Sequence, residues 1–158
     1  MIMRMVWTIG YEQTTMGAFL AALTGAEVEV VADVRALPLS RRPGFSKSAL
    51  AANLAEAGIG YTHLRALGTP PEGRAAARRH DQATLERVYA GQLELPEAMA
   101  AMAQLADLAN TRRTALLCFE RDACGCHRTL LRAAALPDFT AIDLVGDGQW
   151  SCAVGVCE

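Results

Sequence analysis

Apolar runs alternate along the chain with segments in which apolar residues recur every three or four positions. The runs Met5–Ile9 and Thr114–Phe119 are nearly continuous in apolar residues, and Val28–Val34 is rich in valine. Such runs are typical of strands buried on both faces of a parallel sheet. Shorter runs at Ile59–His63 and Phe139–Val145 complete a set of five predicted strands.

The intervening segments carry helical spacing and helix-boundary residues. The first predicted helix begins at Thr14 or Thr15 and stops at Gly25, where a glycine supplies a left-handed turn. The second begins within Ser46–Ser48 and ends at Gly58. Both therefore connect one predicted strand to the next.

The second half of the chain predicts three further helical segments. One runs through Ala75–Tyr89 and is interrupted at Gly91, and another restarts at Pro96, a residue favoured in a first helical turn. The last begins at Cys126-His127-Arg128. Strands alternating with helices predict one α/β domain of three layers, Rossmann-like, with a mostly parallel sheet and helices on both faces. The first strand is expected inside the sheet.

Composition supports a single globular domain with no membrane segment. The 158 residues are 52% hydrophobic and 20% charged, enough to bury a substantial core. No apolar stretch approaches the ~20 residues of a membrane-spanning helix. The apolar start of the chain predicts a strand and not a signal peptide, so a cytoplasmic location is expected and disulfides are not. The sequence leaves open a homo-oligomer.

The net charge of −2 gives no overall basic footprint for sequence-independent nucleic-acid binding, although a local basic cleft is compatible with it. Positive charge gathers in the loop Leu37–Phe45, which is rich in proline and glycine and holds Ser40 and Arg41. This loop follows the second predicted strand directly. It is therefore expected beside the carboxyl edge of the sheet.

Polar side chains follow four of the predicted strands. Tyr11 follows the first strand, Asp33 and Arg35 end the second, His63 ends the third and Glu120 follows the fourth. Open parallel sheets bind ligands outside the carboxyl ends of their strands. The sequence therefore predicts a ligand-binding or active site at this edge, against the alternative that Asp33 and Arg35 only cap helices or form a surface ion pair.

Cys126-His127-Arg128 at a predicted helix start is the sharpest local signal. Unpaired backbone N–H groups and the helix dipole lower the pKa of a thiol there and attract anions. Adjacent helical residues point about 100° apart, so the three side chains cannot all face one ligand. We assign the anion contact to Arg128 and a loop-orienting role to His127, while Cys126 is either a nucleophile or a buried packing residue.

Several specific chemistries lack their motifs. A tyrosine-phosphatase loop needs an arginine six residues after its cysteine, and six after Cys118 comes Cys124. Neither the glycine pattern of a dinucleotide site nor the lysine loop of a P-loop enzyme is present, so no cofactor is expected. The cysteines also lack two properly spaced ligand pairs, and no structural zinc or other metal is expected.

Short pieces of the chain together resemble a known family. The pieces are Thr8-Ile9-Gly10, Asp33-Val34-Arg35 with Pro38 and Ser40, Gly58-Ile59 with Tyr61 and His63, Leu67-Gly68, and Cys118 with Glu120 and Cys126-His127-Arg128. In order and spacing they are similar to the uncharacterised bacterial family catalogued as domain of unknown function 488, over nearly the whole chain. The resemblance implies a three-layer α/β domain without an established reaction.

The first loop departs from that family. Members commonly have His-Ser after the first Thr-Ile-Gly, whereas this chain has Tyr11-Glu12. A phenol and a carboxylate can form hydrogen bonds in place of a histidine, but they do not share its near-neutral titration. The role of that loop, and the substrate with it, can therefore differ from the family's.

Two functional hypotheses follow. The first is an enzyme acting on a phosphate-bearing substrate, a nucleotide or nucleic acid, with Asp33 and Glu120 as acid or base and Cys126 as a covalent nucleophile. The second is a non-catalytic module that binds a nucleotide or a partner at the same edge. The expected ligand contacts are Tyr11, Arg35, Ser40, Arg41, His63, His127 and Arg128.

Overall fold

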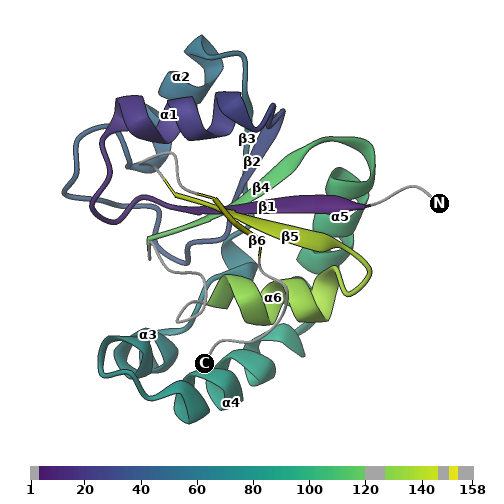
Figure 1. The fold of residues 1–158 in the computed structure, drawn as a ribbon. Helices are drawn as coiled ribbons and strands as arrows, with labels where there is room; N and C mark the ends of the chain where they lie inside the picture. Colours follow the sequence, from purple (N-terminus) through teal and green to yellow (C-terminus); the bar gives the residue numbers. More distant parts are fainter. Residues whose placement is uncertain (1–3, 120–126, 146–149, 153–158) are drawn as a thin grey trace.

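The computed structural model describes residues 4–119, 127–145 and 150–152, and its centre is a twisted sheet (Figure 1). The described strands form one six-stranded sheet in the order β3-β2-β4-β1-β5-β6. The first five in that order pair in parallel, whereas β6 runs antiparallel to β5. The bounds are β1 Met5–Gly10, β2 Val30–Asp33, β3 Gly60–His63, β4 Thr114–Cys118, β5 Thr140–Leu144 and β6 Trp150–Cys152.

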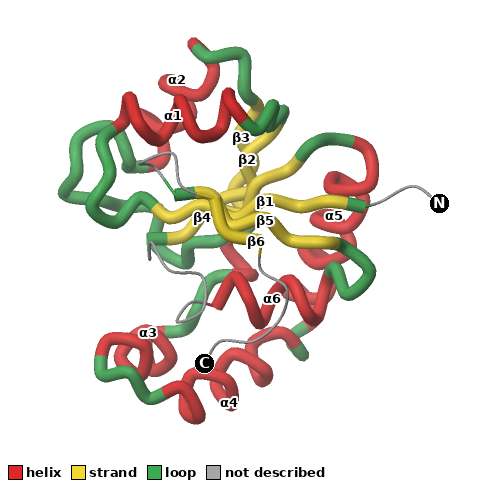
Figure 2. Tube along the Cα trace, in the orientation of Figure 1, coloured by secondary structure: helices red, strands yellow, loops and turns green. Residues whose placement is uncertain are grey.

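Helices cover both faces of this sheet (Figures 1 and 2), with α1 and α2 on one face and α5 and α6 on the other. The predicted three-layer, mostly parallel α/β fold is confirmed, with β1 inside the sheet between β4 and β5. The edge strand β6 is an addition that the sequence did not predict. The helices are α1 Met16–Gly25, α2 Lys47–Glu56, α3 Pro71–Arg78, α4 Gln82–Leu93, α5 Pro96–Thr111 and α6 His127–Ala135, with a 3-10 turn η1 at Arg65–Leu67.

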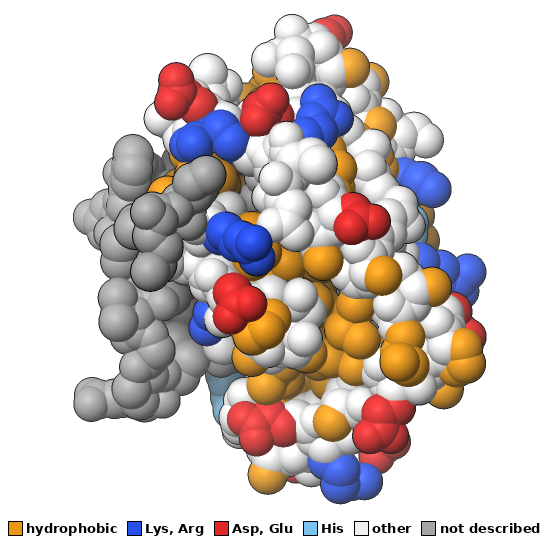
Figure 3. Space-filling model, turned by 90° about the vertical axis from the view of Figure 1, so that its right-hand side faces the viewer, with side chains coloured by type: hydrophobic (Ala, Val, Ile, Leu, Met, Phe, Trp, Pro, Cys, Tyr) orange, Lys and Arg blue, Asp and Glu red, His pale blue; other side chains and the backbone are white. Residues whose placement is uncertain are grey.

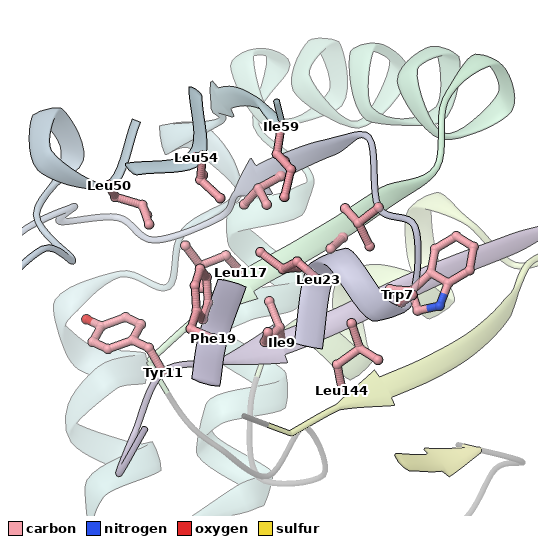
Figure 4. Packing of buried hydrophobic residues seen from close by; sticks show 14 of the residues in the cluster. Trp7, Ile9, Tyr11, Phe19, Leu23, Leu50, Leu54, Ile59, Leu117 and Leu144 are labelled. Atoms are coloured by element: carbon pink, nitrogen blue, oxygen red, sulfur yellow. The ribbon is translucent and has the colours of Figure 1, made fainter. Parts of the chain in front are cut away.

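Side chains alternate between the two faces of the sheet along each strand, and this divides the hydrophobic core into two clusters. Trp7 and Ile9 of β1 pack toward α1 and α2 (Figure 4), whereas Val6 packs on the opposite face. Leu116 and Leu117 of β4 divide in the same way. Successive side chains of a strand point to opposite faces, so a continuous apolar run supplies both clusters. Each such fully buried side chain contributes roughly 1.5–3 kcal/mol.

The boundaries of the first two helices follow local chemistry. The Thr15 side chain caps α1 by accepting the Ala18 N–H at 3.1 Å. Gly58 (φ 76°) supplies the left-handed turn expected after α2. Gly25 differs from expectation, because it is the last residue of α1 and the left-handed turn falls at Glu27 (φ 58°).

The helical middle of the chain breaks at two places, of which the sequence predicted one. The interruption expected at Gly91 falls slightly later, because α4 ends at Leu93, and α5 restarts at Pro96 as expected. The additional break lies at His80 (φ 59°) between α3 and α4. Asp81 accepts the Thr84 N–H at 3.2 Å, which starts the new helix. A glycine within a helix costs only about 1 kcal/mol, so packing and a good N-cap outweigh it.

Candidate functional site

A cavity of about 1000 Å³ opens at the carboxyl edge of the sheet. Residues after β1, β2 and β4 line it together with α3 and the start of α6. Among the residues that the structure describes, its lining holds one acidic side chain, Glu12, although the whole chain carries a net charge of −2. Positive charge is therefore concentrated where a parallel sheet binds ligands. The arginines of this cavity are Arg35, Arg41, Arg42, Arg74 and Arg78.

The opposite, amino edge has a different character. In the view of Figure 3, which faces that edge, basic and acidic side chains are interspersed around an apolar patch. A cavity of about 870 Å³ lies there. Its Arg113 sits over the Trp7 ring, 4.3 Å from the centroid, and donates hydrogen bonds to the carbonyls of Ala26 and Glu27. Arg113 thus tightens the packing of the fold at this edge.

A buried ion pair lies beneath the carboxyl-edge cavity. Arg35 Nε donates to Asp33 Oδ1 at 2.9 Å and Nη2 donates to Oδ2 at 2.8 Å, while Asp33 is fully buried and Arg35 is 5% exposed. Burial lowers the pKa of Arg35, but the hydrogen bonds and the charge of Asp33 raise it by more than burial lowers it. The pKa of Arg35 therefore lies above its ordinary value. The guanidinium is therefore held charged by its own carboxylate.

Two tyrosines complete this buried cluster. Tyr61 Oη donates to Asp33 Oδ2 at 2.5 Å, and Arg35 Nη1 donates to Tyr11 Oη at 3.4 Å. Burial, followed by the hydrogen bond to Asp33, raises the pKa of Tyr61 above its usual range. Tyr11 also stacks on Phe45, with ring centroids 4.8 Å apart. Tyr61 thus ties β3 to the carboxylate of Asp33, and Tyr11 ties the segment after β1 to the guanidinium of Arg35.

The same arginine anchors the segment 37–45, which we call the basic loop. Arg35 Nη1 donates to the Phe45 carbonyl at 2.7 Å, which fixes the end of this loop. Gly44 has φ 90°, a conformation that a side chain would strain. Arg42 Nη1 donates to the Thr14 carbonyl at 2.6 Å and links the loop to the segment before α1.

Gly68 sets the opposite wall of the cavity. A β-carbon at this position would lie 2.2 Å from the backbone nitrogen of Ala36, far inside contact distance. Only glycine allows the segment after η1 to approach the chain this closely as it leaves β2. Thr69 follows and lines the cavity, and its carbonyl accepts a hydrogen bond from Arg74 Nη1 at 2.9 Å.

Two histidines hold successive carbonyls at the end of β2. His127 Nε2 lies 2.8 Å from the Val34 oxygen, and His63 Nε2 lies 2.8 Å from the Arg35 oxygen. A carbonyl oxygen only accepts, so each Nε2 carries the donated hydrogen. His127 Nδ1 then faces Cys118 Sγ at 3.5 Å. Both Cys118 and His127 line the cavity.

The predicted site residues divide into three groups. Asp33, His63 and Arg128 are absent from the lining, and Arg128, the expected anion contact, is only 1% exposed. Glu120 and Cys126 lie outside the described residues. The residues that do meet at the cavity are Tyr11, Arg35, Ser40, Arg41 and His127.

Sequence reasoning missed part of the lining. Arg74 and Arg78 stand four apart on α3, and residues at this spacing share one helix face. That spacing could have indicated a basic helix face next to the predicted site. Cys118 lies within an apolar run, and no sequence pattern predicts that it contacts His127 nine residues later.

Two possible properties can be checked against the described part of the chain. Its His, Cys, Asp and Glu side chains form no group of three that could hold a metal ion, although Cys124 and Cys126 lie outside it. None of its helices has both the length and the apolar character needed to cross a membrane.

Comparison with known proteins identifies the family. No curated protein and no solved structure matches the chain significantly. The family model described as Domain of unknown function DUF488 matches residues 15–135, which include β2 to β4, the helices α1 to α6 and the basic loop. Because that match covers well over half of the sequence, the chain belongs to the DUF488 family.

Proposed function

We propose that the protein is an enzyme that acts on a phosphate-bearing substrate, a nucleotide or nucleic acid, in the carboxyl-edge cavity. The observation that carries this proposal is the charge of the described part of the lining, where five arginines, of which Arg35 is already paired with Asp33, stand against the carboxylate of Glu12. Guanidinium groups match phosphate in geometry and charge and form hydrogen bonds about twice as strong as neutral ones. A dianionic phosphate fits this surplus of positive charge.

The arginines differ in how much of their charge is available. Arg35 is bonded to Asp33 and to the Phe45 carbonyl, so its role is to support the basic loop. Arg41 and Arg78 are exposed, and neither pairs with a carboxylate within the described ranges. These two are therefore the main proposed phosphate contacts.

Arg42 and Arg74 can assist. Each gives one N–H to a backbone carbonyl and keeps further donors on its guanidinium. The Arg128 contact expected from the sequence is not part of this proposal, because that side chain is buried and does not line the cavity.

An apolar rim favours an organic phosphate over the free ion. Leu37, Leu39 and Phe119 line the cavity and are exposed, at 53%, 73% and 44% respectively. Aromatic side chains stack on nucleobases with about 1–3 kcal/mol per base. A nucleotide can place its phosphate among the arginines and its base against this rim.

Titration calorimetry with adenosine 5′-monophosphate tests the proposal. Arg41→Ala and Arg78→Ala should each weaken binding roughly tenfold or more, since a hydrogen bond to a charged group contributes about 1.5–3 kcal/mol. Arg87→Ala is the matched control, because Arg87 is 71% exposed and lies outside the cavity lining. Equal affinity in all four proteins would contradict the proposed site.

A non-catalytic binding module remains the second candidate. One observation favours it: Asp33, the expected acid or base, is fully buried and bonded to Arg35 and Tyr61 instead of facing the cavity. Release of inorganic phosphate or another product from the bound nucleotide separates the two functions. A cytoplasmic location also stays a prediction, which cell fractionation tests.

A further inference from the structure

The Cys118–His127 pair is the reactive grouping of the described residues that the sequence hypotheses did not assign. Cys118 ends β4 and His127 begins α6, so both stand at the carboxyl edge of the sheet. Cys118 Sγ lies 3.5 Å from His127 Nδ1, within hydrogen-bond range for sulfur, and both residues line the cavity. Cys118, although only 5% exposed, therefore borders the space in which the arginines would hold a phosphate.

The orientation of His127 is fixed by a third group. Its Nε2–H donates to the Val34 carbonyl at 2.8 Å, which leaves Nδ1 of the neutral ring as an acceptor directed at sulfur. The Tyr89 ring packs edge-on against the imidazole, with centroids 5.2 Å apart. A nucleophile, a base within reach and a group that orients the base are the parts of an activated cysteine.

We propose that Cys118 is the covalent nucleophile of this site and that His127 is its base, in hydrolysis of a phosphomonoester. This inference rests on the proposed binding of a phosphate-bearing substrate. It places the nucleophile at the end of β4 instead of at Cys126, which lies outside the described residues. Arg41 and Arg78 are the groups that neutralise the non-bridging oxygens during transfer.

The reaction balances without an oxidant or a metal. The Cys118 proton passes to His127 Nδ1, and the sulfur attacks phosphorus to form an S–P bond. The P–O bond to the leaving alcohol breaks, its electron pair stays on that oxygen, and the proton on Nδ1 passes to it. Water then attacks phosphorus and gives a proton to Nδ1, while the S–P bond breaks and its electron pair returns to sulfur, which takes the proton back from Nδ1. The sum is phosphomonoester plus water giving alcohol plus inorganic phosphate.

Alkylation of the wild-type protein tests the thiol directly. With iodoacetamide at pH 7 and peptide mass spectrometry, Cys118 should react about tenfold faster than an ordinary thiol, of which only a few per cent is thiolate at that pH. The other four cysteines provide the comparison within the same sample. His127→Gln should slow labelling of Cys118 about tenfold, and inorganic phosphate should protect it in the wild type but less in Arg78→Ala.

Turnover provides the second arm, with adenosine 5′-monophosphate and p-nitrophenyl phosphate as substrates. Cys118→Ser and Cys118→Ala should lower release of inorganic phosphate at least a thousandfold while nucleotide affinity stays within twofold. Arg87→Ala should match the wild type. Cys126→Ser tests the competing nucleophile, and loss of turnover there with retention in Cys118→Ser would overturn the assignment.

The results separate this inference from the proposed function. Arginine-dependent nucleotide binding without turnover in the wild type, or without accelerated Cys118 labelling, would overturn the nucleophile and leave the binding site intact. Absence of nucleotide and phosphate binding in the wild type would remove both. Rapid labelling, phosphate protection and loss of turnover in both Cys118 variants together would establish the nucleophile.

Discussion

The guanidinium of Arg35 and the carboxylate of Asp33 meet edge to edge, through two hydrogen bonds of 2.9 and 2.8 Å, while both side chains are buried. The two residues are separated only by Val34 at the end of β2. Removing one member of such a pair leaves the other as an uncompensated buried charge, which is far more costly than the pair itself. The pair therefore acts first on folding.

Asp33→Asn should lower the free energy of unfolding by about 3 kcal/mol or more, because Arg35 would lose its counter-charge in a buried position. Urea denaturation measures this loss. Glu72→Gln, which removes the exposed partner of Arg87, is the matched control and should cost less than about 1 kcal/mol. A stable Asp33→Asn protein that binds nucleotide without turnover would instead support the acid or base role expected from the sequence.

Tyr61 should give the protein an alkaline stability loss. Its pKa in the folded state is raised above the ordinary value near 10, so its contribution is fully present below about pH 10 and is lost as pH rises toward the folded-state pKa. Absorbance titration of the wild type minus Tyr61→Phe should show this phenol ionising above the usual range. The urea midpoint of unfolding should fall between pH 8 and pH 11, and this fall should be smaller in Tyr61→Phe than in the wild type.

Arg128→Ala should destabilise the fold, in contrast to the mild effect that a partly exposed anion contact would give. Arg128 is 1% exposed and is among the largest fully buried side chains. Truncating so large a buried side chain should cost roughly 3 kcal/mol or more. Thermal unfolding of Arg128→Ala beside Arg87→Ala checks this, and equal melting temperatures would show that Arg128 contributes little to folding.

Gly68→Ala should disturb the cavity wall because its β-carbon would meet the Ala36 backbone at 2.2 Å. We expect a loss of about 1–3 kcal/mol in stability, together with weaker nucleotide binding. Gly17→Ala serves as the control, since a β-carbon within α1 meets nothing within 4 Å and should stabilise the helix by roughly 0.5–1 kcal/mol. Similar behaviour of both variants would contradict the close approach.

The central strands of the sheet could be predicted because each corresponds to a short apolar run in the sequence. Val30 to Asp33 and Thr114 to Cys118 are buried throughout, and that burial appears directly as a continuous apolar run. The break at His80 could not be predicted, because it depends on a left-handed non-glycine residue, which tertiary packing stabilises without a glycine signal.

The position of the site at the carboxyl edge was also predictable, but the contacts that each polar side chain makes there were not. Asp33 and Arg35 follow a strand as a site residue would, yet nothing in the order of residues distinguishes a carboxylate facing solvent from one bonded to its neighbour. Cys118 and His127 show the reverse problem. Their approach depends on where α6 docks against β4, which is a tertiary contact.

Two histidines brace successive peptides just after β2, since His127 holds the Val34 oxygen and His63 holds the Arg35 oxygen. A backbone braced in this way should exchange its amide hydrogens slowly, while the basic loop that follows opens more easily. The conformational entropy lost on ligand binding is then confined largely to that loop. For ligands that reach Arg41 and Leu39, this ordering should therefore offset part of the binding free energy.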